Sequence, residues 1–143
     1  MRVATLSVSS KVASAQENIW PKKEGAPPRA GVPYSPATKA GGFIFISGQT
    51  SVKEDGDYLS VESSVTEKAH RMCQNARAIL ESAGSSTEKV VNVKVYFTNI
   101  DQDYDEFNKV YAEYFPHNPS RTSVEVTGLP KPADLEIDVI ALA

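Results

Sequence analysis

Two charged residues near the end of the chain, Arg121 and Glu136, have side chains that could work together on a small substrate. A guanidinium binds a carboxylate through two parallel hydrogen bonds, and a carboxylate can orient a water molecule and take a proton from it. The Ser47-Gly48 pair adds a hydroxyl group and a backbone that a ligand can approach closely. These residue types favour binding of a small carboxylate and activation of water.

The chain around both charged residues is predicted to form two strands. Valines alternate with polar residues over 122–127, and apolar residues recur at every second position over 135–141. This period is typical of half-buried strands. If the first strand begins at Arg121, that residue and Glu125 lie on its polar side. We expect this strand to neighbour the closing strand, so that opposite charges, among them Glu136, face each other.

A structural interpretation of the same residues stays open. An exposed ion pair between neighbouring strands would account for Arg121 and Glu136 without any ligand, and such a pair contributes little to stability. Tyr34 and Ser47 equally fit ordinary packing or capping roles. The residues alone do not decide between these two interpretations.

The remaining pattern predicts one mixed α/β domain. Strands are expected over 43–46 and 90–98, with a short edge strand over 3–8 as an option. Helical spacing of apolar residues runs from Val61 to Ala83, with Ser60 or Ser64 as the N-cap, the latter in a capping box with Glu67. A second helix over 103–115 is opened by Asp101 or Asp103 and carries an aromatic stripe, interpreted as core.

This order of elements places both helices on one face of a mixed sheet. The other face is expected to carry Lys94, Tyr96, Glu125, Glu136 and Ile140. A half-polar sheet face of this kind meets either water or other copies of the chain, so we expect an oligomer.

The composition excludes several classes of function. The chain has 143 residues, 41% hydrophobic and 23% charged, which fits one domain with a core. Its 15 basic and 18 acidic residues are interspersed and give a net charge of −3, which argues against binding to nucleic acid or to an anionic membrane. No apolar run approaches the roughly 18–20 residues of a membrane span.

The sequence offers no metal or nucleophile motif. Its single cysteine, Cys73, lies among helical residues and is interpreted as a buried thiol in a reducing compartment. Two histidines far apart in the chain provide no metal-ligand spacing, and no histidine is placed to activate a nucleophile. We therefore expect neither metal nor cofactor.

Residues 1–32 differ from the rest of the chain. Four prolines fall between positions 21 and 33, which predicts an extended N-terminal arm, followed by a globular domain over 33–143. Trp20 is interpreted as an anchor for this arm. The first residues are free of acids and rich in serine, so a mitochondrial presequence is an alternative to a cytoplasmic location.

Several ordered motifs from Pro33 to the end of the chain resemble the reactive intermediate deaminase family (RidA-like, also called YjgF-like). These motifs are PYSPA, FISGQ, VKVYFTNI, PSRTSVEV, LPK and LEIDVIA. The resemblance implies a chorismate-mutase-like fold, a homotrimer with clefts between subunits, and cofactor-independent hydrolysis of 2-imino acids to 2-oxo acids and ammonia. Activity toward 2-iminobutanoate and 2-iminopropanoate would prevent metabolite damage by these reactive intermediates.

The resemblance also implies roles for individual residues. Arg121 matches the arginine that holds the substrate carboxylate, and Glu136 matches the glutamate near the attacking water. Four further positions match residues that line the cleft, namely Tyr34, Ser47, Gly48 and Tyr96. Because imines hydrolyse unaided in water, positioning together with one proton-transfer group is a sufficient catalyst.

The sequence departs from the family pattern at Ser123, where many members have cysteine, and at Pro36, where glutamine is common. The arm of roughly 25 additional residues also has no counterpart in the family pattern. Two other functions stay open. One is non-enzymatic or regulatory binding of small carboxylates in the same cleft, and the other, disfavoured by the acidic charge balance, is an endoribonuclease.

Overall fold

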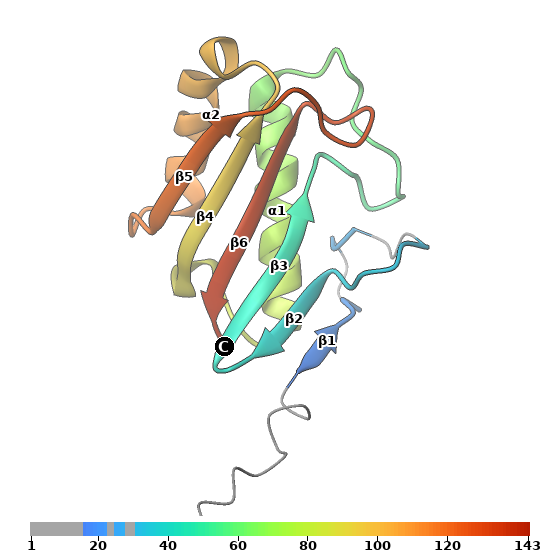
Figure 1. Ribbon diagram of the computed structural model, residues 1–143, viewed down its shortest axis with the longest axis vertical. Helices are drawn as coiled ribbons and strands as arrows, with labels where there is room; N and C mark the ends of the chain where they lie inside the picture. The colour runs from blue at the N-terminus through green and yellow to red at the C-terminus, as the bar shows by residue number, and fades with distance from the viewer. Residues whose placement is uncertain (1–15, 23–24, 28–30) are drawn as a thin grey trace, which may run out of the picture.

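The computed structural model describes residues 16–22, 25–27 and 31–143, which form one mixed six-stranded sheet with two helices. The strands follow the order β1-β2-β3-β6-β4-β5 across the sheet (Figure 1). Their bounds are β1 Glu17–Ile19, β2 Ala37–Ala40, β3 Phe43–Gln49, β4 Val90–Phe97, β5 Ser120–Glu125 and β6 Leu135–Leu142. All neighbouring strands are antiparallel except β4 and β5, which are parallel.

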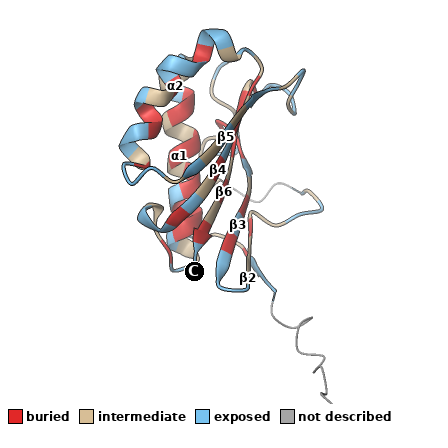
Figure 2. Cartoon of the chain, turned by 60° about the vertical axis from the view of Figure 1, so that its left-hand side comes forward, coloured by how far each residue is buried: buried red, intermediate tan, exposed pale blue. Residues whose placement is uncertain are grey.

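Both helices, α1 (Val65–Ser82) and α2 (Ile100–Tyr114), pack on one face of the sheet, as predicted. The buried residues of the helices and of the central strands meet between these two layers (Figure 2). The core includes fully buried Ile44, Met72, Phe97, Phe107 and Ile137. Cys73 is also buried, as expected, and burial raises the pKa of its thiol to about 12.

Both helices begin at residues that differ from the predicted ones. Helix α1 begins at Val65, and Ser64 caps it through the predicted capping box with Glu67. Val61 lies before the helix and is 61% exposed. Helix α2 is capped by Asn99, whose side chain accepts a hydrogen bond from the backbone of Gln102, so neither predicted aspartate is the cap. The asparagine competes successfully because its side chain has the same capping ability as aspartate.

Two strands were not predicted. Strand β2 pairs with β3 across the Gly41-Gly42 turn, where both glycines have positive φ. Strand β1 belongs to the 1–32 segment and pairs with β2 through the register Ile19↔Ala37. These strands have only three and four residues, too short for a periodic signal. The optional strand over 3–8 lies outside the described residues.

The prediction that the strand of Arg121 neighbours the closing strand is wrong. Strands β4 and β5 form a parallel pair joined by α2, and β6 pairs with the opposite edge of β4. A parallel connection needs a crossover element, and a helix between two strands supplies it. Strand β5 therefore lies at one edge of the sheet, and β4 separates Arg121 from Glu136.

The sheet face without helices, called here the open face, carries both polar and apolar side chains. Lys94, Tyr96 and Glu136 lie on it, as expected, because they alternate with buried residues of β4 and β6. Glu125 does not, since its carboxylate accepts a hydrogen bond from the backbone of Ile100 at the start of α2, 2.9 Å away. Several exposed apolar residues complete the face, namely Phe43, Phe45, Val124 and Leu142.

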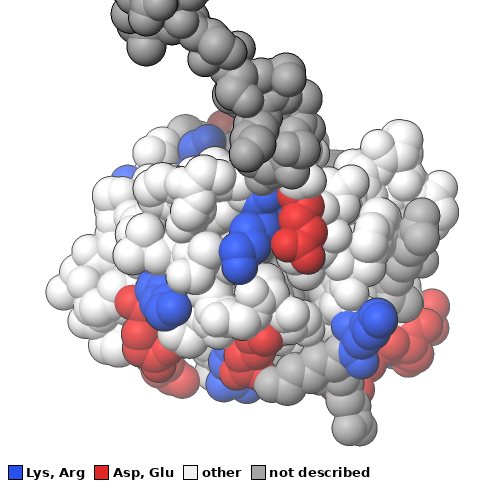
Figure 3. Space-filling view, turned by 90° about the horizontal axis from the view of Figure 1, so that it is seen from below, with Lys and Arg blue, Asp and Glu red and all other residues white. Residues whose placement is uncertain are grey.

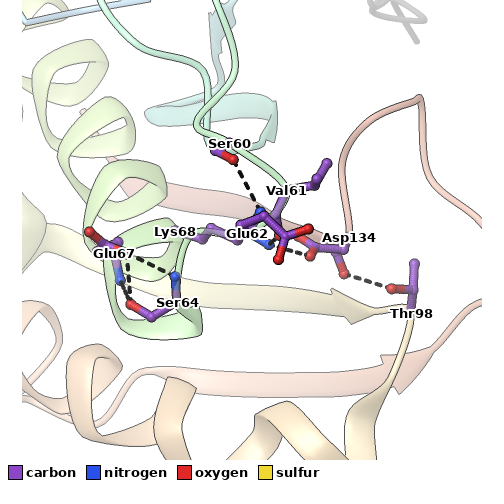
Figure 4. Close-up of polar contacts among 8 residues, drawn as sticks. All are labelled: Ser60, Val61, Glu62, Ser64, Glu67, Lys68, Thr98 and Asp134. Carbon is purple, nitrogen blue, oxygen red and sulfur yellow. Dashed lines mark hydrogen bonds and ion pairs between the residues drawn. The ribbon is translucent and has the colours of Figure 1, made fainter.

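An ion pair on α1 holds the loop that leads into β6. The ammonium of Lys68, whose side chain is 6% exposed, lies 2.6 Å from Asp134 and donates to the backbone oxygen of Val61 at 3.0 Å (Figure 4). The backbone oxygen of Asp134 also accepts hydrogen bonds from Thr98. Burial, followed by repulsion from Asp134, raises the pKa of nearby Asp103, and Lys68 opposes this rise.

We expect Lys68→Met to lower the free energy of unfolding by about 2 kcal/mol at pH 7, because it leaves two neighbouring acids without their cation. This is below the roughly 3–5 kcal/mol of a fully buried pair, since Asp134 is partly exposed. Urea unfolding measures the difference. The control is Lys109→Met, which breaks an exposed pair with Glu106 and should change stability by less than about 1 kcal/mol. Equal losses in the two variants would contradict the assignment.

Charged side chains do not gather into a basic patch on the surface shown in Figure 3, where basic and acidic side chains lie next to each other in several small groups. Within the described ranges, no helix combines the length and the apolarity needed to cross a membrane.

Candidate active site

The structure brings four of the predicted site residues together at one hollow on the open face, called here the Glu136 hollow. Tyr34, Ser47, Gly48 and Glu136 all line it. The Ser47 hydroxyl donates a hydrogen bond to the backbone oxygen of Ser35 at 2.8 Å, and its backbone N–H donates to Pro36 at 2.9 Å. Ser47 thereby fixes the segment that carries Tyr34, whose own side chain is 59% exposed.

Gly48 allows the carboxylate of Glu136 to lie directly against the backbone of β3. A Cβ atom at this glycine would lie 2.2 Å from Oε1 of Glu136, far inside van der Waals contact. Any larger residue would therefore displace the carboxylate. The requirement here is for space and not for an unusual backbone angle.

Burial, and then repulsion from Asp138, raises the pKa of the Glu136 carboxyl. Among the described residues, no hydrogen bond to this carboxylate is seen. A half-buried acid with a raised pKa next to a hollow is well suited to exchange protons with a bound molecule.

The sequence did not indicate Asp138, which lines the Glu136 hollow beside Lys94. Tyr96, the fifth predicted residue, lies on the same face and donates its hydroxyl to Asp138 at 3.0 Å. Burial, followed by this hydrogen bond, raises the pKa of Tyr96. Tyr96 therefore contacts the Glu136 hollow through Asp138. Asp138 could have been identified from the sequence, because Glu136, Asp138 and Ile140 occupy every second position of β6 and so share one face.

Arg121 does not join these residues within one chain. It pairs with Val93 in the β4–β5 register, and Val93 faces the helices. Glu136 alternates with the buried residues Leu135 and Ile137 and therefore faces the other way. The two predicted catalytic residues thus lie on opposite faces of the sheet and on strands that are not neighbours.

Neutral side chains from α2 hold the guanidinium of Arg121. It donates hydrogen bonds to Asn108 Oδ1 at 2.8 Å and to the Tyr104 hydroxyl at 3.0 Å. Its central carbon lies 4.7 Å from the centre of the Tyr111 ring. Within the described part of the chain, no carboxylate pairs with Arg121. An arginine has five N–H donors, so this arrangement orients the group and leaves its charge unpaired.

Two buried hydroxyls near Arg121 have no hydrogen-bond partner among the described residues, those of Tyr111 and Ser123. Tyr111 stacks against the guanidinium, and Ser123 follows Arg121 on the same side of β5. A buried hydroxyl without a hydrogen-bond partner lowers the stability of the folded protein, so such groups are uncommon. Two of them beside a charged group indicate a place where a ligand could bind. Helical spacing had identified the aromatic stripe of α2 as core, and the contacts of Tyr104 and Tyr111 with Arg121 were missed.

A six-stranded mixed sheet with two helices on one face is the YjgF/chorismate-mutase-like fold, as the solved structures that match the chain show. The crystal structure of YEO7_yeast has a TM-score of 0.81 and 36% identity, covering 89% of this chain and 98% of its own. Escherichia coli TdcF with bound serine has a TM-score of 0.77 and 30% identity, covering 89% of this chain and 98% of its own.

The sequence comparisons agree with the fold. The family described as endoribonuclease L-PSP matches residues 24–143. Protein HMF1 of Saccharomyces cerevisiae is 41% identical over 115 residues, 80% of this chain and 87% of its own length. Reactive Intermediate Deaminase A, chloroplastic, of Arabidopsis thaliana is 34% identical over 140 residues, 96% of this chain and 71% of its own length. The chain belongs to the YjgF/RidA family, which includes reactive intermediate deaminases.

Proposed function

We propose that the protein hydrolyses reactive 2-imino acids, among them 2-iminopropanoate and 2-iminobutanoate, to 2-oxo acids and ammonia without metal or cofactor. The observation that carries this proposal is that two groups suited to this reaction lie on the two faces of the sheet. On one face, neutral side chains of α2 orient Arg121, whose charge is unpaired among the described residues, and on the other an acid with a raised pKa lies in a hollow. The likeness to a reactive intermediate deaminase supports it.

The site is proposed to form between copies of the chain. Arg121 and Glu136 cannot reach one ligand from opposite faces of the same sheet, so a second copy must supply one of them. The exposed apolar residues of the open face, such as Phe45 and Leu142, are suited to lie against such a copy. A homotrimer with three equivalent clefts is the proposed assembly, and light scattering behind size-exclusion chromatography tests it.

In the proposed reaction, Arg121 binds the substrate carboxylate through two N–H groups and thereby places the imine carbon beside a water molecule. Glu136 takes a proton from this water as its oxygen bonds to the carbon and passes the proton to the imine nitrogen, which gives a carbinolamine. Glu136 then moves the hydroxyl proton of the carbinolamine to the nitrogen, the carbon–nitrogen bond breaks as the carbonyl forms, and ammonia leaves. One water is consumed for each 2-oxo acid and ammonia formed, and no group is oxidised or reduced.

The test of the proposal is ammonia release from 2-iminopropanoate, generated in situ from alanine by an amino-acid oxidase. The purified protein should increase the rate over the uncatalysed hydrolysis. A rate that does not depend on protein concentration would rule the proposal out.

A second candidate function is binding of small carboxylates without turnover. It is favoured by the solved TdcF structure, which holds bound serine. Saturable binding of 2-oxobutanoate with no acceleration of imine hydrolysis would support it over the deaminase. An endoribonuclease is the third candidate, because the family description names that activity. The scattered charges of Figure 3 do not favour it.

The proposed domain division is an N-terminal extension over 1–32 and a RidA-like domain over 33–143, with β1 as the extension's contribution to the sheet. The cytoplasm is the proposed location, with the mitochondrial matrix as the alternative.

Gly48→Ala should lower kcat/KM for 2-iminopropanoate about 100-fold, because the added methyl group must push the Glu136 carboxylate out of place. Only the end of a flexible side chain has to move, so the melting temperature should change little. Steady-state kinetics and calorimetry measure the two effects. Gly128→Ala is the matched control, since a Cβ there meets no atom within 4 Å. Full activity of Gly48→Ala would show that the position of the Glu136 carboxylate does not matter.

A further inference from the structure

We propose that the preferred substrates are 2-imino acids with a large apolar or aromatic side chain, and that a second hollow binds this side chain. This inference rests on the proposed function. The second hollow, called here the side-chain hollow, has a volume of about 280 Å³. It shares Tyr34, Ser47 and Gly48 with the Glu136 hollow, so the two adjoin along the end of β3.

The side-chain hollow is lined mostly by aromatic and apolar residues, and none of its lining residues carries a charge. This apolar lining includes Trp20, Pro27, Val32, Tyr34, Val52 and Tyr58. The methyl group of 2-iminopropanoate is comparable to one water molecule, about 30 Å³, and would fill little of this space. A benzyl or branched aliphatic group would contact several walls at once, and each such contact adds to affinity.

Hydrogen bonds from buried side chains fix one wall of the side-chain hollow. The amide of Asn75, fully buried on α1, donates to the backbone oxygens of Thr50 at 3.2 Å and of Val52 at 2.8 Å. Val52 in turn pairs with Tyr58 in a short antiparallel bridge, which holds the tyrosine at the rim. This wall is therefore formed before any ligand arrives, which reduces the entropic cost of binding.

Described residues of the N-terminal extension supply another part of the lining. Trp20 directly follows β1, whose last residue, Ile19, is buried. Arg71 on α1 donates a hydrogen bond to the backbone oxygen of Gly25 at 3.0 Å and lies 3.8 Å from the carboxylate of Glu54. The hydrogen bond to Gly25 and the pairing of β1 with β2 tie described parts of the extension to the body of the protein. Trp20, Pro27 and Val32 of the extension thereby line part of the side-chain hollow.

The adjoining hollows fit the parts of one substrate. If the imine carbon lies beside Glu136, the adjoining side-chain hollow is within reach of the remaining substituent on that carbon. The shared residues Ser47 and Gly48 line both hollows. The side-chain hollow is therefore positioned to receive the part of the substrate that differs from one amino acid to another.

The test compares binding of two 2-oxo acids by isothermal titration calorimetry, 2-oxopropanoate and 3-phenyl-2-oxopropanoate. The full chain should bind the phenyl compound about 10-fold more tightly or better, as expected for added apolar groups in a fitting pocket. Tyr58→Ala and Trp20→Ala should both reduce this ratio, and the tyrosine variant keeps the test decisive if loss of Trp20 impairs folding. Val61→Ala, an exposed residue that does not line the side-chain hollow, should keep the wild-type ratio.

Equal affinities, tighter binding of 2-oxopropanoate, no saturable binding of either acid, or a ratio unchanged in folded Tyr58→Ala would each overturn the inference. Imine hydrolysis is measured separately. Ammonia release from 2-iminopropanoate without preference for the phenyl compound would leave the deaminase proposal intact and refute the side-chain hollow. Preferential binding of the phenyl compound without ammonia release from any imine would refute the deaminase proposal and support the side-chain hollow as a binding site.

Discussion

Arg121→Ala should lower kcat/KM for 2-iminopropanoate hydrolysis about 1,000-fold. The variant loses the two N–H groups proposed to hold the substrate carboxylate, and such charge-assisted pairs in a site shielded from water carry large effects. Its stability should change little, because the groups that accept hydrogen bonds from the guanidinium within the described ranges, on Asn108 and Tyr104, can bond to water instead. Steady-state kinetics together with titration of 2-oxobutanoate measures the loss.

Arg77→Ala is the matched control for this variant. Arg77 also lies over a tyrosine of α2, with its central carbon 5.8 Å from the ring of Tyr114, but it is remote from the proposed site. The control should retain activity within about twofold, as is usual for exposed substitutions away from a site. Arg121→Lys keeps the charge and loses the planar fork, so its activity should fall between the wild type and the alanine variant. An Arg121→Ala protein with full activity would refute the assigned role.

Glu136→Gln is the second variant with a large expected effect, a loss of kcat of about 100- to 10,000-fold, the range of general acid–base catalysis. An amide has the shape of the carboxyl group and cannot accept the proton of water. Binding of 2-oxo acids should be retained, which separates this loss from that of Arg121→Ala. Kinetics of both variants on one substrate measures the difference, and wild-type turnover by Glu136→Gln would remove the proton-transfer role.

The raised pKa of Glu136 gives this prediction a pH dependence. The carboxylate is the form that accepts a proton, so wild-type kcat/KM should rise with pH through a pKa above the ordinary value of about 4.3. Asp138→Asn removes one of the two causes of the rise in pKa and should move this acid limb to lower pH. A limb that does not move would show that another group controls it.

The raised pKa of Glu136 also makes the stability of the folded protein depend on pH. A carboxyl group whose pKa is raised in the folded state favours folding most when it is neutral. Its contribution is present below the unfolded pKa and is lost as the pH rises through the folded pKa. Glu136→Gln should therefore be more stable than the wild type at pH 7, and the difference should vanish in acid. A functional residue that costs stability in this way is common at active sites.

Mixing the two inactive variants tests whether copies of the chain share a site. When Arg121→Ala and Glu136→Gln chains assemble at random into trimers, about one quarter of the clefts between subunits receive both wild-type residues. Activity should return to about that fraction of the wild type in co-refolded samples, while separately folded and then mixed samples should stay inactive. No recovery after co-refolding would refute a site built by two chains.

The sequence by itself determined the class of fold and most of its elements. Period-two patterns located β4 and β6, and helical spacing together with the capping box at Ser64 located α1, because these signals depend on neighbours along the chain. The ordered motifs from Pro33 onward indicated the family, which the comparisons confirm. The grouping of Tyr34, Ser47, Gly48 and Glu136 was also anticipated through these motifs, and the structure brings the four side chains to one hollow.

Only the tertiary structure decided where the two charged groups lie. The helix between β4 and β5 makes those strands parallel and leaves β6 on the other side of β4, so Arg121 and Glu136 lie on strands that are not neighbours. The register pairs Arg121 with buried Val93, whereas Glu136 alternates with buried residues of β6, so the two side chains lie on opposite faces. Strand patterns fix which residues alternate, but not which strands become neighbours or which face the helices cover. Contacts between distant segments settle that choice. Such contacts also place Tyr111 against Arg121 and bring Trp20 into the lining of the side-chain hollow.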